Sequence, residues 1–259
     1  MASDTRLNVL LSRVRRGALA TALLSIGIAR SSPAQLPGMP EHERMMEWGK
    51  TLFVLFDQLE YAPGASGRPF NVDGRAWYGG AVSRLWLLFQ GEGATTERDG
   101  EADLQMMYGR LIDPFWDAVA GVRIDRQWGS AAASRVHFAV GLIGLAPYRF
   151  ELSPTLFVST DGDISARLEA GYQILITQRL IAEPEFELNA ALQAVPELGI
   201  RRGVNDYEYG LRIRYEIRRE FAPYVGWSFS RRSAALPDGS AEGEHRRASR
   251  LVFGLRLWR

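Results

Sequence analysis

The stretch that decides the fold is Ile164–Thr177, with the sequence ISARLEAGYQILIT. Apolar and polar residues take turns along it, and the apolar set is Ala166, Leu168, Ala170, Tyr172, Ile174 and Ile176. A helix would scatter these side chains around its circumference, whereas a strand places every second residue on the same face. The stretch therefore predicts a β-strand with one apolar face and one polar face.

Two later segments, Arg179–Leu192 and Asp206–Arg218, show the same alternation. Their polar faces carry a row of carboxylates, namely Glu183, Glu185, Glu187, Asp206 and Glu208. An apolar face along one side of every strand and a charged face along the other is typical of a sheet that separates lipid from a polar interior.

The alternation continues along the chain from about Leu52 onward and defines twelve candidate strands. They are Thr51–Tyr61, Asp73–Gly80, Arg84–Gly93, Glu101–Arg110, Trp116–Asp125, Arg135–Leu145, Tyr148–Ser159, Ile164–Thr177, Arg179–Leu192, Asn205–Arg219, Ala222–Arg231 and Ser249–Trp258. Single-chain bacterial barrels have an even number of strands, with short turns at one end and longer loops at the other. Tight connections such as Ala146-Pro147 and long ones such as Arg232–Ala248 fit this asymmetry. Gly91-Glu92-Gly93 is expected to form the turn after the third strand.

We therefore predict an all-β fold, a transmembrane antiparallel β-barrel of about twelve strands. A soluble β-sandwich is the alternative, because its strands also alternate when one face is wet. Strand lengths near ten residues, with aromatic residues such as Tyr108, Trp116 and Trp258 toward the strand ends, favour the barrel.

The first residues have the three parts of an export signal. A basic stretch with Arg15 and Arg16 precedes the apolar run Gly17–Ala29, and small residues at Ser32 and Ala34 suit cleavage after Ala34. A transmembrane anchor is the alternative, but the run is shorter than the ~20 apolar residues that a spanning helix needs. The expected organisation is a signal peptide in residues 1–34, a short segment containing Met and His in 35–50, and the barrel in 51–259.

Composition excludes several classes of site. The chain has no cysteine, which removes thiolate metal sites, disulfides and a cysteine nucleophile. Its formal net charge of +1 provides no global basic field, so we expect no nucleic acid partner.

Several strings in the barrel region carry a family resemblance. They are DQLE at Asp57–Glu60, EADLQMMYGR at Glu101–Arg110, PFWD at Pro114–Asp117, GLAPYRFE at Gly144–Glu151, RLEAGYQILITQRLIAEPEFELN at Arg167–Asn189 and LRIRYEIRREFAPYVG at Leu211–Gly226. With these strings in order, the chain from Asp57 to Trp258 resembles the copper resistance protein B family. The resemblance implies a protein of the bacterial outer membrane, in contact with outer-membrane lipid, that binds copper ions and serves copper resistance and homeostasis. It also implies a periplasmic multicopper oxidase as partner.

The family often carries a long stretch rich in Met and His before the barrel, which here is reduced to Gln35–Trp48. Thioether and imidazole ligands suit Cu(I), because soft sulfur matches a soft cation. The candidate copper ligands are Met39, His42, Met45 and Met46. The alternative is that Met45 and Met46 make plain apolar contacts.

The carboxylates Glu183, Glu185, Glu187, Asp206 and Glu208 are candidate contacts for cations in the barrel lumen, since rings of carboxylates attract cations in channels. The alternative is a salt-bridged filling that stiffens the interior. Sequestration of copper, its export through the lumen and docking of the partner oxidase all stay open, as does a general porin or structural barrel without a metal role.

A barrel lipid hydrolase is a further alternative, because His137 lies in a candidate strand. Nucleophilic catalysis needs a hydroxyl within hydrogen-bond reach of the base. The local string His137-Phe138-Ala139 has no neighbouring hydroxyl, and Ser134 and Ser159 stay open as nucleophiles, including from another strand. We therefore predict a protein that is not an enzyme.

Overall fold

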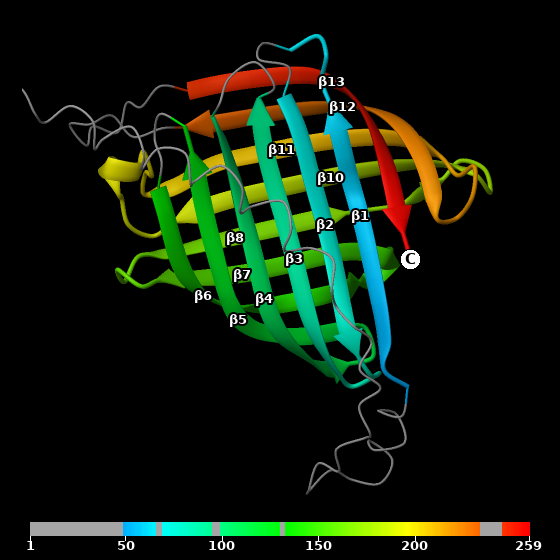
Figure 1. Cartoon of the computed structure of the whole chain (residues 1–259), viewed down its shortest axis with the longest axis horizontal. Coiled ribbons are helices and arrows are strands. Elements are labelled where there is room, and N and C mark those ends of the chain that lie inside the picture. Colours follow the sequence, from blue (N-terminus) through cyan, green and yellow to red (C-terminus); the bar gives the residue numbers. More distant parts are fainter. Residues whose placement is uncertain (1–48, 66–68, 95–98, 130–132, 234–244) are drawn as a thin grey trace, which may run out of the picture. The chain divides into compact units, whose positions relative to one another are not determined.

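The computed structural model describes residues 49–65, 69–94, 99–129, 133–233 and 245–259, which form one antiparallel sheet (Figure 1). Its strand segments are β1 (Thr51–Tyr61), β2 (Pro69–Gly79), β3 (Ser83–Ala94), β4 (Gly100–Asp113), β5 (Trp116–Trp128), β6 (Ala133–Ala146), β7 (Phe150–Ser159), β8 (Ile164–Gly171), β9 (Ile174–Leu175), β10 (Leu180–Ala191), β11 (Gly203–Tyr215), β12 (Phe221–Ser233) and β13 (His245–Trp258). Two short 3₁₀ turns, Pro147–Arg149 and Pro196–Leu198, connect strands. Among the described residues, no helix is long and apolar enough to cross a membrane.

The sheet closes into a barrel with twelve strand positions. β8 and β9 both pair with β10, so they are two pieces of one strand interrupted at Tyr172 and Gln173. β1 pairs with β2 on one side and with β13 on the other, which leaves no open edge at the seam. The predicted twelve-stranded antiparallel barrel is confirmed.

The two ends of the barrel differ. At one end, which we call the turn end, the strands are joined by residues 80–82, 114–115, 147–149, 176–179 and 216–220. At the other, the loop end, the connections are 62–68, 95–99, 129–132, 160–163, 192–202 and 234–244. The predicted turn at Gly91–Gly93 is wrong, because these residues continue β3 in register with β2 and β4.

Side chains follow the alternation that the sequence predicts. Outward residues are apolar and exposed, such as Phe138 on β6, of which 65% is accessible. On the inner faces of β3 to β7, a buried apolar cluster fills part of the interior and consists of Trp86, Met107, Val119, Ala139 and Phe157. The rest of the interior is polar, and that polar part holds the candidate site.

Candidate functional site

The barrel lumen contains a cavity of about 710 Å³ that is lined mainly by charged and amide side chains. All five of the predicted carboxylates line it: Glu183, Glu185, Glu187, Asp206 and Glu208. They come from β10 and β11, which are neighbours in the wall. Alternation along these two strands is therefore enough to bring the five groups to the inner surface.

Two of the five carboxylates are neutralised by buried arginines. Glu183 accepts a hydrogen bond from Arg214, whose residue is only 2% exposed. Glu185 accepts one from Arg212, with 2.5 Å between Nη1 and Oε2, and the Nε of the same arginine lies 2.6 Å from Oε1 of Glu60 on β1. These contacts are those expected of the salt-bridged filling, and both carboxylates also line the luminal cavity.

The other three carboxylates lie nearer the loop end and are less compensated. Glu187 and Glu208 face each other directly in the register of β10 and β11. Asn189 Nδ2 donates to both Glu187 and Asp206 at 2.8 Å, and Ser228 Oγ donates to Glu208 at 2.8 Å. Like charges directly opposite each other on a sheet destabilise it, so a cation near Glu187 and Glu208 would reduce their repulsion.

Guanidinium groups approach this pair only at longer range. Arg167 Nε is 3.4 Å from Glu187 Oε1, and Arg250 Nη2 is 3.8 Å from Glu208 Oε2. Both arginines make shorter contacts with other acceptors. Each of these two arginines is therefore shared between two or more carboxylates at this level of the lumen.

Asp73 on β2 and Glu169 on β8 extend the acidic group across the lumen. Gln90 Nε2 on β3 donates to both carboxylates, at 3.0 Å to Asp73 and 3.2 Å to Glu169. The sequence places Glu169 on a polar face, but it gives no signal that Asp73 lies near it. That proximity depends on closure of the barrel.

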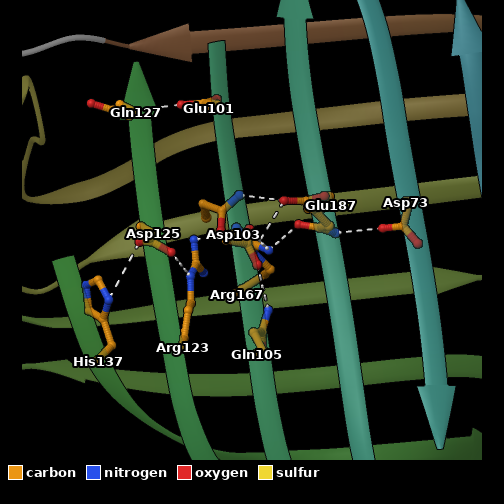
Figure 2. A network of polar contacts seen from close by, with 12 residues as sticks. Asp73, Glu101, Asp103, Gln105, Arg123, Asp125, Gln127, His137, Arg167 and Glu187 are labelled. Atoms are coloured by element: carbon orange, nitrogen blue, oxygen red, sulfur yellow. Dashed lines mark hydrogen bonds and ion pairs between the residues drawn. The ribbon is translucent and has the colours of Figure 1, made fainter. Parts of the chain in front are cut away.

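Arg167 on β8 links opposite walls of the barrel (Figure 2). Its Nη1 donates to Asp103 Oδ2 on β4 at 3.2 Å and to Gln90 Oε1 on β3. Arg123 on β5 also approaches Asp103, at 3.4 Å. The network in Figure 2 therefore crosses the lumen and narrows it.

His137 lies on the inner face of β6, with Nδ1 3.6 Å from Oδ2 of Asp125 (Figure 2). Ser159 is its direct partner on β7, yet the Ser159 hydroxyl accepts from Arg135 at 2.9 Å and donates to Asp161 at 3.5 Å. Ser134 is exposed and alternates to the outer face. These hydroxyl contacts give no support to a serine nucleophile activated by His137.

Other predicted features fall outside the described residues. These are the signal peptide in residues 1–34 and the candidate ligands Met39, His42, Met45 and Met46. Within the part of the chain that the structure describes, no group of three or more His, Asp or Glu side chains has an arrangement that could hold a metal ion.

Comparison with known proteins identifies the family. The model of the family described as copper resistance protein B precursor (CopB) matches residues 50–259. Copper resistance protein B of Escherichia coli is 41% identical over 206 residues, which cover 79% of this chain and 68% of that protein. A copper resistance protein B homolog of Pseudomonas syringae pv. tomato is 38% identical over 207 residues, covering 80% and 69% of the two chains.

Among solved structures, a NanC porin superposes with a TM-score of 0.50 at 11% identity, covering 80% of this chain and 99% of the porin. At that identity the likeness concerns the fold alone, and it agrees with the closed barrel. The family assignment rests on the sequence matches, which extend over the whole barrel. The chain belongs to the copper resistance protein B family, and its role is in copper resistance.

Proposed function

We propose that this protein serves copper resistance from the bacterial outer membrane, by binding copper ions at carboxylates in its lumen and so assisting their sequestration or export. The exposed apolar outer face supports the membrane location, because a soluble protein rarely exposes so continuous an apolar surface. Outer-membrane lipid and a periplasmic multicopper oxidase are the proposed partners.

The observation that carries copper binding is the pairing of Glu187 with Glu208 in register, beside Asp206. Carboxylate oxygens are accepted by Cu(II) in tetragonal sites. Conduction or transfer of an ion requires sites that bind it without holding it permanently. Partly compensated carboxylates meet that requirement better than the fully paired Glu183 and Glu185.

The test is the double variant Glu187→Gln/Glu208→Gln, which removes the charges and keeps the shape. We expect Cu(II) affinity of the purified barrel to fall about tenfold, or about 1.4 kcal/mol, and copper tolerance of cells that express it to fall as well. The matched control is Glu220→Gln in an exposed turn at the turn end. Unchanged affinity and tolerance in the double variant would overturn the proposal in favour of a porin or structural barrel.

The segment before the barrel is a second proposed copper contact, resting on its donor chemistry. Met39, His42, Met45 and Met46 supply thioether and imidazole groups that suit Cu(I). Changing all four to Ala should weaken Cu(I) binding by the mature protein while leaving Cu(II) binding in the lumen in place. Equal Cu(I) binding by the variant and the wild type would remove this segment from the proposal.

A further inference from the structure

The imidazole of His137 is buried, and one of its nitrogens has no hydrogen-bond partner. The residue is 6% exposed, it lines the luminal cavity, and its buried Nδ1 makes no hydrogen bond. Asp125 Oδ2 is the facing acceptor at 3.6 Å, which is too long for a hydrogen bond. A buried polar atom without a partner costs about 1–3 kcal/mol, and such atoms are rare in native proteins. One explanation of an orphan of this kind is an ion that binds there.

Both side chains are held in place by their neighbours. The imidazole packs edge-on against Phe157, with 6.4 Å between ring centroids and an interplanar angle of 72°. Arg123 Nε donates to Oδ1 of Asp125 at 2.5 Å, which fixes that carboxylate and leaves Oδ2 toward His137. The Nδ1 atom of His137 and the Oδ2 atom of Asp125 therefore face each other across one gap, and each can donate a lone pair to a metal ion.

The carboxylates around this gap are more numerous than the arginines that pair with them. Arg123 lies near both Asp103 and Asp125, and Arg135 is bonded to Asp163. Asp103 also pairs with Arg167, which reaches Glu169 and Glu187 in turn. Arg135 also approaches Asp161, so each of these three arginines lies near two or more carboxylates. Six carboxylates in this network face three guanidinium groups.

We propose that His137 Nδ1 and Asp125 Oδ2 form a mixed nitrogen and oxygen site for Cu(II) in the lumen. Imidazole and carboxylate together match the tetragonal N,O preference of Cu(II), with water in the other positions. Two protein ligands make a site for an ion in passage rather than a resident one. The site deepens the proposed function and rests on it, since copper must enter the lumen to reach His137.

The chain has three histidines, which makes the site directly observable. A background variant, His42→Gln/His245→Gln, leaves His137 as the single imidazole. After labelling of histidine with ¹⁵N, electron paramagnetic resonance of bound Cu(II) should show a superhyperfine pattern that changes with the label. Adding His137→Gln should abolish this dependence. A folded background barrel that binds Cu(II) without any dependence on the label overturns the site.

A second variant tests the site even where the His137→Gln variant does not fold. Asp125→Asn should weaken Cu(II) binding about tenfold in the background barrel while the nitrogen signal persists at saturation. The matched control, Asp113→Asn, changes an exposed carboxylate at the turn end of β4 and should alter neither property. Unchanged affinity in Asp125→Asn removes the carboxylate from the site.

The outcome is separable from that of the Glu187/Glu208 experiment. Nitrogen coordination is read from the spectrum, whereas the proposed function is read from copper tolerance. A ¹⁵N-dependent signal together with normal tolerance in Glu187→Gln/Glu208→Gln supports the His137 site and overturns the carboxylate function. Loss of tolerance without a ¹⁵N-dependent signal supports the function and overturns the His137 site.

Discussion

Arg250 on β13 donates a hydrogen bond across the lumen to Glu92 on β3, with 2.8 Å between Nη1 and Oε1. Arg232 on β12 makes a similar contact with Glu101 on β4, also at 2.8 Å. Each pair joins strands that are not neighbours in the wall, near the loop end. Both arginines therefore reach across part of the lumen near its mouth at the loop end.

Arg250→Ala should open this mouth. We expect the conductance of single barrels in a planar lipid bilayer to rise severalfold, because the variant removes a side chain that reaches into the lumen and leaves Glu92 with only its longer contact to Arg232. Arg247→Ala is the matched control, since it removes the same side chain from the outer face of the same strand. Equal conductance in the two variants would show that Arg250 does not restrict the passage.

The contact between Arg232 and Glu101 is partly solvated, because 59% of the Arg232 side chain is exposed. Exposed ion pairs contribute about 0–1 kcal/mol and weaken as salt screens them. We therefore expect Arg232→Ala to leave the free energy of unfolding nearly unchanged. A loss of more than about 2 kcal/mol, measured by urea unfolding in lipid vesicles, would contradict this prediction.

Arg214→Met should destabilise the barrel strongly. The arginine is buried and bonds to Glu183 and to Gln173, so its removal leaves a buried carboxylate without its cation. Breaking a buried pair in this way costs about 3–5 kcal/mol. Urea unfolding followed by tryptophan fluorescence measures the loss. The double variant Arg214→Met/Glu183→Gln should recover much of it, and no recovery would show that the cost comes from packing.

Phe138→Arg tests whether the outer face contacts lipid. The residue lies midway along β6 and points outward. An arginine facing lipid costs about 2–4 kcal/mol at the bilayer midplane and about 0–1 kcal/mol near the interface. Ser134→Arg, on the same face of the same strand but close to the loop end, is the control. Equal small losses of stability in both variants would indicate that this face meets water.

Gly109→Ala should disturb the apolar cluster. A Cβ at this position would lie 2.7 Å from Cδ1 and Nε1 of Trp86, and 3.3 Å from Cγ1 of Val119. The indole must then move and weaken its hydrogen bond to Asp117. Overpacking of this kind costs about 1–3 kcal/mol. A variant with wild-type unfolding free energy would mean that Trp86 moves without loss.

Much of the fold follows from the sequence, because alternation with period two depends on single residues and their neighbours. Ile164–Thr177 was predicted as one strand and does occupy one wall position, yet its break at Tyr172 and Gln173 has no signature in the pattern. Gly91 and Gly93 resemble turn residues, but they lie inside β3, where the phenyl rings of Phe89 and Phe70 pack close to their backbone.

The site was less predictable, for a geometric reason. Alternation indicates which carboxylates face inward, but not which arginine reaches them. Arg167 and Asp103 are 64 residues apart and meet only because the sheet closes. The facing of Glu187 and Glu208 likewise depends on the register of β10 and β11. His137 showed no partner in its local sequence because Asp125 lies on the adjacent strand.

The seam between β1 and β13 has a consequence for assembly. All other neighbouring strands in the wall are consecutive along the chain, apart from β8 and β10, which pair although β9 lies between them in sequence. At the seam, Val54 and Arg259 exchange two backbone hydrogen bonds of 2.9 Å. These two residues lie near opposite ends of the barrel sequence. β1 is synthesised before β13, so one edge of β1 stays unpaired until β13 has been added to the chain. Contacts between such distant residues carry the largest loop-closure entropy, so we expect the seam to be the last part of the wall to form. Until the seam forms, the unpaired edge of β1 offers a template for pairing with another chain.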